Sequence, residues 1–300
     1  MIYSAFGLTF QSTLKLPDFR VEPASTKGTD VVIDFGPAPR PAGLAEIVPA
    51  VLAGTDEFWM EVPGVGRILV VAGARITGDL DPGVDAAQLT PFILSTAMGA
   101  LLHQRGVTPF HACTAVIGDT VVAFVGESGA GKSTLALHLS RRGHRVLGDD
   151  LCATRLRGDV PWVWPGPASL KLRRDALERV GLSSAGRDRV AASADKVFHR
   201  PAQLASDHPV RLDMVAQLAV RDGPAQLVSL TSSDGVALLV ANTFRGQLVP
   251  ALGLSGAHWQ RCVAIARGVT FTRLERAWST SGIAGSVAAI EDHCKFRYRR

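Results

Sequence analysis

The residues with the clearest chemical meaning form the segment GESGAGKST, Gly126 to Thr134. It fits the pattern G-x-x-x-x-G-K-[ST], in which backbone N–H groups surround phosphates, the lysine reaches the β- and γ-phosphates and the hydroxyl residue binds Mg²⁺. The sequence therefore predicts a nucleotide-phosphate site with eight members: Gly126, Ser128, Gly129, Ala130, Gly131, Lys132, Ser133 and Thr134.

Two adjacent carboxylates, Asp149 and Asp150, end the apolar stretch that follows this segment. Neighbouring side chains of a strand point to opposite faces, so the two carboxylates are expected to have different roles. At the edge of a parallel sheet beside a phosphate loop, one can hold Mg²⁺ while the other faces an attacking hydroxyl. The simpler alternative is a pair of aspartates that caps a turn.

A histidine, His111, precedes the strand that leads into the loop, within PFHACTAV. If its own strand runs beside the strand of Asp149, the imidazole can pair with a carboxylate and tune its basicity. The alternative is a histidine with a purely structural role.

The elements around these residues match the setting that a phosphate loop requires. TVVAFVG reads as a short buried strand that enters the loop, KSTLALHLSRR as the helix after it, and HRVLGDD as the next strand. Two arginines complement the dipole at the end of this helix, and Gly143 follows them. The order strand, loop, helix, strand is the context in which the motif is informative.

The region before the loop has a different pattern. Residues 1–85 read as short strands separated by turn residues. A helix is predicted over 91–105, with Thr90 as N-cap, Pro91 in the first turn and Gly106 as the stop. Its apolar line is Leu89, Ile93, Ala97 and Leu101. We therefore expect a β-rich N-terminal domain over 1–88 and a P-loop domain over 89–300.

The chain after the loop is expected to continue as a mixed α/β domain. We predict a short helix in LRRDALERVG, a mobile loop over 183–194, and paired strands in RLDMVAQLAV and AQLVSL. The remaining predicted elements are helices near 234–244, 256–267 and 282–293, with the strand VTFTRL before the last of them.

Composition limits the class of protein. The chain has 300 residues, 47% of them hydrophobic and 20% charged, which indicates a well-buried globular protein. A net charge of +5 is too diffuse to indicate nucleic-acid binding. The four cysteines show no C-x-x-C pair and are expected to be reduced thiols. Neither a signal peptide nor a membrane-spanning stretch is recognisable, so we expect a cytoplasmic protein.

Three other nucleotide-dependent classes are disfavoured. LSGAHWQ resembles the signature of ABC transporter ATPases, but Ala257 stands where those proteins have a second glycine. The Asn-Lys-x-Asp element of switch GTPases is missing, because Asn242 is the only asparagine and Thr243 follows it. The H-R-D motif of eukaryotic-type protein kinases does not occur in the chain.

The stretch FHACTAVIGDTVVAFVGESGAGKSTLALHLSRRGHRVLGDD resembles the catalytic core of the HPr kinase/phosphorylase family. That family shows a histidine before the strand, G-[DE]-S-G-x-G-K-S, and a strand ending in two aspartates. The resemblance implies a fold of the HPr kinase / phosphoenolpyruvate carboxykinase type. It also implies that Asp149 is the base for an acceptor serine, that His111 is its partner, and that Asp150 and Ser133 are metal ligands.

The layout is most similar to the HPr-kinase-like proteins of ribosomal peptide clusters, among them the kinases that phosphorylate the C-terminal serine of lasso peptide precursors. The shared features are LLHQRG, FHA, the P-x-x-L-K-L element Pro167 to Leu172, and a later lysine, Lys196. The similarity implies that Lys171 and Lys196 contact phosphate or a substrate carboxylate; two surface lysines are the alternative.

The sequence thus leads us to expect an ATP- and Mg²⁺-dependent serine kinase acting on a peptide or small protein. No membrane or nucleic-acid partner is expected, and a homo-oligomer is compatible with the sequence. Two alternatives stay open. One is a kinase for a small metabolite, and the other is a nucleotide-binding sensor that binds a peptide without modifying it.

Overall fold

The computed structural model divides into two compact units. The first consists of Met1–Pro109 and Phe244–Gln260, and the second of Phe110–Thr243 and Arg261–Arg300. The division differs from the predicted boundary between residues 88 and 89, since the helical segment up to Gln104 belongs to the first unit. The residues that the structure describes are 1–23, 28–167, 169–190, 195–201, 203 and 208–297.

The described part of the first unit contains a nine-stranded sheet in the order β3-β1-β2-β4-β9-β8-β7-β6-β5. Side chains alternate between buried and partly exposed positions along β8, as expected when one face of a sheet is packed. The short strands predicted for this region are therefore confirmed. Their bounds are β1 Ile2–Ala5, β2 Leu8–Ser12, β3 Arg20–Glu22, β4 Val31–Phe35, β5 Ala45–Val48, β6 Val51–Ala53, β7 Glu57–Val62, β8 Gly66–Val71 and β9 Arg75–Leu80.

A continuous helical segment follows these strands, as α1 (Ala86–Phe92), the π-helical turn η1 (Ile93–Ala97) and α2 (Met98–Gln104). The predicted start at Thr90 is wrong, because Asp85 is the N-cap and accepts from the N–H of Ala87 at 2.7 Å. Pro91, which lacks a backbone N–H, therefore lies inside the helix, and the wide turn η1 begins two residues later at Ile93.

The predicted apolar line of this helix is confirmed. Leu89, Ile93, Ala97 and Leu101 are all fully buried. The predicted stop is also confirmed, since Gly106 has a positive φ of 70° and the N–H of Val107 bonds to the carbonyl of Leu102 at 3.0 Å.

The second unit contains, in its described part, a six-stranded mixed sheet in the order β13-β11-β12-β19-β21-β20. Strand β11 is antiparallel to both of its neighbours, whereas β12, β19 and β21 are parallel to one another. The two strands predicted to pair, β19 and β20, are separated by β21, so that prediction is wrong. The bounds are β11 Cys113–Ile117, β12 Thr120–Val125, β13 Arg145–Gly148, β19 Met214–Val220, β20 Gln226–Ser229 and β21 Thr270–Arg276.

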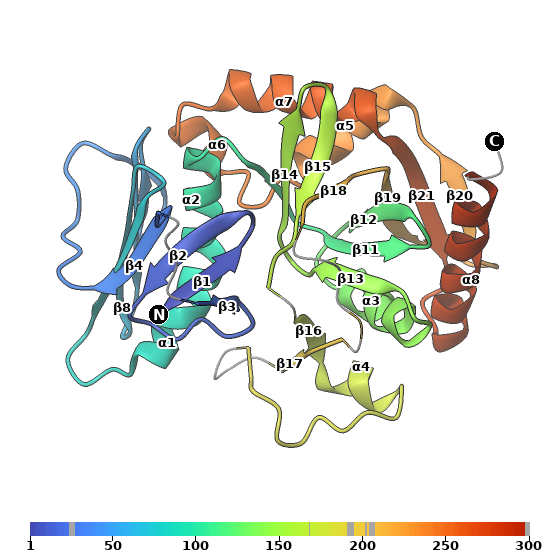
Figure 1. The fold of residues 1–300 in the computed structure, drawn as a ribbon, viewed down its shortest axis with the longest axis horizontal. Helices are drawn as coiled ribbons and strands as arrows, with labels where there is room; N and C mark the ends of the chain where they lie inside the picture. Colours follow the sequence, from blue (N-terminus) through green and yellow to red (C-terminus); the bar gives the residue numbers. More distant parts are fainter. Residues whose placement is uncertain (24–27, 168, 191–194, 202, 204–207, 298–300) are drawn as a thin grey trace. The chain divides into compact units, whose positions relative to one another are not determined.

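Both faces of this sheet are covered by helices (Figure 1). Val122 and Phe124 of β12 pack in one cluster with residues of α3 (Lys132–Arg141) and α8 (Thr280–Arg297). Alternate residues of β12 face a second cluster, to which α5 (Ser232–Ala241) and α7 (Ser255–Gly268) contribute. Because both faces are buried, β12 is apolar almost throughout rather than alternating.

Smaller elements complete the described chain. A four-stranded sheet has the order β10-β14-β15-β18, and β16 pairs with β17. The predicted loop 183–194 has no helix over 183–190, and 191–194 lie outside the described residues. The bounds are β10 Thr108–Phe110, β14 Cys152–Arg157, β15 Val160–Trp164, β16 Leu170–Arg173, β17 Lys196–His199, β18 Val210–Arg211, α4 Arg174–Glu178 and α6 Leu248–Ala251.

All four cysteines are buried free thiols, as predicted. Among the described residues, no helix has both the length and the apolar character needed to cross a bilayer.

Candidate active site

The glycine segment forms the loop that the motif predicts, between β12 and α3. Gly126, Gly129 and Gly131 have φ values of 140°, 88° and 88°, which residues with a side chain rarely adopt. Gly131 is the N-cap of α3, and no side chain caps this end of the helix. The first N–H groups of a helix lack partners within it, so this end can bind an anion.

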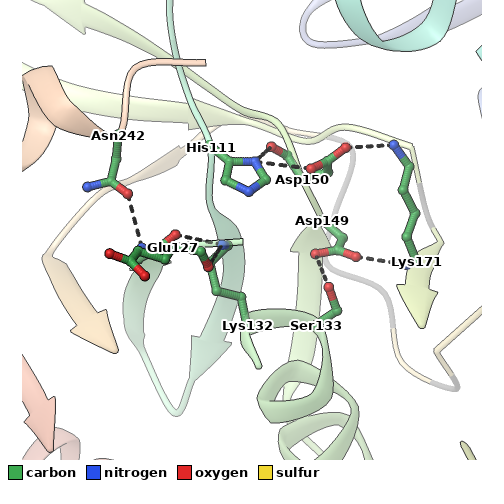
Figure 2. Close-up of polar contacts among 9 residues, drawn as sticks. His111, Glu127, Lys132, Ser133, Asp149, Asp150, Lys171 and Asn242 are labelled. Atoms are coloured by element: carbon green, nitrogen blue, oxygen red, sulfur yellow. Dashed lines mark hydrogen bonds and ion pairs between the residues drawn. The ribbon is translucent and has the colours of Figure 1, made fainter. Parts of the chain in front are cut away.

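Lys132 lies folded against the same loop. Its ammonium donates to the carbonyls of Gly126 at 2.8 Å and Glu127 at 3.0 Å, and only 6% of the residue is exposed (Figure 2). Burial lowers the pKa of Lys132, while the charges of Asp149 and Asp150 act in the opposite direction. An ammonium with so little water around it interacts strongly with phosphate oxygens that replace its carbonyl partners.

Sheet topology explains why distant segments of the chain meet at the loop. Because β11 is antiparallel to β12 and β13, its beginning lies at the edge where the other two strands end. Cys113 is opposite Phe124, and Thr114 is opposite Gly148. His111, two residues before β11, and the two aspartates after β13 are therefore brought to the edge that carries the phosphate loop.

The first aspartate, Asp149, interacts with the loop side of the site. Its carboxylate accepts from the Ser133 hydroxyl at 2.9 Å and from the backbone N–H of Lys171 at 2.8 Å. Only 8% of Asp149 is exposed. Burial raises the pKa of Asp149, and these hydrogen bonds offset part of the effect. Two oxygen-bearing side chains in contact, one a buried carboxylate, are suitable ligands for a hard cation such as Mg²⁺.

The second aspartate, Asp150, pairs with the histidine. Its Oδ1 lies 3.1 Å from His111 Nδ1 and its Oδ2 accepts from the Lys171 ammonium at 2.7 Å (Figure 2). Burial would raise the pKa of Asp150, but the His111 hydrogen bond and the Lys171 charge outweigh it and hold the pKa well below its ordinary value. Asp150 is therefore an ionised carboxylate whose orientation is fixed on both sides.

The predicted pairing of His111 with Asp149 is wrong: the histidine pairs with Asp150, and Ser133 pairs with Asp149. The two carboxylates contact different groups, which is compatible with the different roles expected for them. The pairing was mispredicted because β13 ends at Gly148 and Asp150 adopts a left-handed backbone with φ of 73°. Strand alternation does not determine the direction of a side chain beyond such a turn.

The two predicted lysines differ in their contacts. Lys171 of β16 belongs to the site, since its backbone holds Asp149 and its ammonium holds Asp150. Lys196 is exposed at the start of β17, in register with Arg173. Burial is the main cause of the lowered pKa of Lys132, and the charge of Lys196 adds to it. Lys196 therefore contributes to the positive field of the site.

Sequence reasoning missed Asn242, the C-cap of α5. Its side-chain oxygen accepts from the N–H of Gly126 at 3.0 Å, and its backbone carbonyl accepts from the N–H of His111 at 2.7 Å. Its amide nitrogen donates to the carbonyl of Leu238 at 2.8 Å, which fixes the orientation of the amide. One residue thus links the start of the loop to the histidine. It lies far from both in sequence, so no local motif could have indicated it.

A comparison with a curated protein supports the resemblance to an HPr kinase-like family. The chain is 30% identical over 132 residues to an HPr kinase/phosphorylase from an Exiguobacterium species. The match covers 41% of this chain and 40% of that protein, so the chain spans less than half of this curated relative. The solved structure of the Hpr(Ser) kinase/phosphatase from Coxiella burnetii aligns with 64% of this chain and 99% of its own, with a TM-score of 0.36 and 13% identity. No protein-family model matches the chain.

Proposed function

We propose that this chain is an ATP- and Mg²⁺-dependent serine kinase that phosphorylates a peptide or small protein. The observation that carries the proposal is that the two aspartates contact different groups. One contacts the Ser133 hydroxyl of the phosphate loop, and the other is an ionised carboxylate held by His111 and Lys171. A site that only binds nucleotide has a use for the first carboxylate but not for the second.

The loop and Lys132 would hold the triphosphate. The N–H groups around Gly129 and Gly131 and the first turn of α3, including Thr134, face a bound phosphate chain in proteins with this motif. Lys132 would exchange the carbonyls of Gly126 and Glu127 for β- and γ-phosphate oxygens. Its charge and the loop N–H groups would stabilise the negative charge that develops on the transferring group.

Ser133 and Asp149 would hold Mg²⁺. Their oxygens are 2.9 Å apart, and a cation would offset the burial that raises the pKa of the Asp149 carboxyl. This donor set fits a hard cation that binds through few protein oxygens and substrate phosphates. Mg²⁺ bound there supplies neutralising charge to the phosphate oxygens.

Asp150 would orient the acceptor. The serine oxygen attacks the γ-phosphorus, the bond from that phosphorus to the bridging oxygen breaks, and the nucleoside diphosphate leaves. The serine proton passes to the Asp150 carboxylate. To accept it, Asp150 must release one of its two partners, and the mobile ammonium of Lys171 is the group suited to move toward phosphate. His111 stays bound to Asp150 and keeps its direction.

A reaction with defined acceptors tests the proposal. The layout it shares with lasso peptide precursor kinases makes a C-terminal serine the first acceptor to examine. The protein would be incubated with ATP and Mg²⁺ and either a precursor peptide encoded beside its gene or an HPr protein, and the products analysed by mass spectrometry. We expect an added phosphoryl group on one serine. Phosphorylation of a small metabolite alone, or tight ATP binding with no transfer to any acceptor, would overturn the proposal.

The role of Asn242 leads to a second prediction. Asn242→Ala removes the acceptor of the buried Gly126 N–H and should lower kcat/KM by at least about tenfold, because the loop loses its fixed position relative to His111. Initial rates with the accepted peptide would measure the change.

The same helix provides the control. Thr231, at the opposite end of α5, forms a capping box with Asp234. Thr231→Ala should cost about 1 kcal/mol of stability without changing activity. If the two variants lose activity in proportion to their loss of Tm, then Asn242 serves only the stability of the helix.

A further inference from the structure

Trp278, an exposed tryptophan beside the phosphate loop, has no part in the proposed phosphoryl transfer. Trp278 follows β21, and 58% of it is exposed, although tryptophan is mostly buried in folded proteins. Two atoms of its ring, Cζ3 and Cη2, lie only 3.7 Å from the position that a Cβ on Gly131 would occupy. The indole is thus both accessible to solvent and adjacent to the N-cap of α3.

Arg276 fixes this ring to the loop. Its guanidinium donates to the carbonyl of Ala130 at 2.8 Å, and its Cζ lies 5.2 Å from the centre of the Trp278 ring. Arg276 is 98% buried, since only 2% is exposed, and burial lowers its pKa. Within the described chain no carboxylate forms an ion pair with Arg276, and its guanidinium contacts the loop carbonyl and the indole instead. Arg276 thus connects the phosphate loop to the indole ring of Trp278.

The sheet order places this ring opposite the transfer machinery. In the order β13-β11-β12-β19-β21, the aspartates and the histidine come from β13 and β11, on one side of the loop strand β12. Trp278 comes from β21, on the other side of β12. A triphosphate bound with its γ-phosphate toward Asp150 has its α-phosphate, and hence its sugar and base, at the opposite end of the loop.

We propose that Trp278 is the nucleobase-binding residue of this site, and that its exposed surface stacks on the base of the bound nucleoside triphosphate. The inference rests on the proposed function, because it requires the loop to hold a nucleotide. One side of the indole is in contact with Arg276, and stacking on an aromatic ring suits any base. Gly131 completes the subsite, because a Cβ there would lie 2.6 Å from Arg276 Nη2 and displace it.

Isothermal titration calorimetry with two ligands tests this assignment. MgATP carries a base, whereas magnesium tripolyphosphate offers the phosphates alone. Trp278→Ala should weaken MgATP binding about tenfold, which corresponds to about 1.4 kcal/mol, and leave tripolyphosphate binding unchanged. Trp278→Phe should retain most of the affinity. The matched control is Trp259→Ala, which removes another exposed tryptophan, with 55% exposure, and should change neither affinity.

The outcomes separate this inference from the proposed function. Equal MgATP affinity in the wild type and Trp278→Ala would overturn the base site, as would an equal loss for both ligands. Failure of the wild type to bind either ligand would overturn the proposed function as well. Tryptophan fluorescence gives an independent measure: ATP should quench the wild type and the Trp259→Ala variant, and quench Trp278→Phe far less.

Discussion

Replacing Asp150 with asparagine is expected to lower kcat by about a thousandfold while nucleotide affinity stays within a fewfold of the wild type. Asparagine has the same size but cannot take the proton of the acceptor hydroxyl, and positioned acid–base groups contribute about 10²–10⁴ in rate. The carboxylate of Asp150 contacts His111 and Lys171 rather than the loop, so MgATP binding should be almost unaffected. Initial rates of phosphopeptide formation and calorimetry with MgATP measure the two quantities.

The neighbouring aspartate is the matched control. Asp149→Asn removes the carboxylate that contacts Ser133, and it should raise the Mg²⁺ concentration needed for half-maximal rate. Excess Mg²⁺ or Mn²⁺ should restore part of the activity of Asp149→Asn and none of that of Asp150→Asn. The opposite pattern of rescue would return the base to Asp149 and the metal to Asp150, as the resemblance to the HPr kinase/phosphorylase family implies.

The contacts of these two aspartates mark the limit of what the sequence could predict. The loop between Gly126 and Lys132 was predictable because its function depends on local backbone conformation, which glycines and a following helix encode within a few residues. The same holds for the buried line of Leu89, Ile93, Ala97 and Leu101, since helical periodicity is a local property.

The features that were missed depend on tertiary structure. The left-handed backbone of Asp150, φ 73°, persists because His111 and Lys171 hold its side chain, and neither is near it in sequence. Asn242 and Trp278 reach the loop from strands and helices that the sheet order brings together, so no spacing in the sequence indicates them. The start of the first helix was misplaced because proline is favoured in a first turn, yet here a π-helical turn accommodates Pro91 within the helix.

Lys132→Met is expected to lower kcat/KM by about a thousandfold without lowering the Tm of the protein measured in the absence of nucleotide. The loss follows from removing the cation that stabilises charge on the transferring group. The stability of the fold should be kept because only 6% of Lys132 is exposed, and methionine offers similar length without a charge to desolvate. A residue that lowers the stability of the fold but is required for the reaction is typical of a functional site.

The difference in Tm between Lys132→Met and the wild type should depend on pH. Burial lowers the pKa of Lys132, so the unfolded chain holds the proton more tightly than the folded protein does. At neutral pH Lys132 is charged in both the folded and the unfolded state, and burial of its charge lowers the free energy of unfolding by the full amount. This cost disappears as the pH rises through the lowered pKa toward the ordinary pKa of lysine. The Tm of Lys132→Met relative to the wild type should therefore be highest near pH 7 and decrease toward pH 10. Lys295→Met, at an exposed lysine of α8, should show no such trend. A Tm for Lys132→Met well below the wild type at pH 7 would mean that the bonds to Gly126 and Glu127 stabilise the loop more than burial costs it.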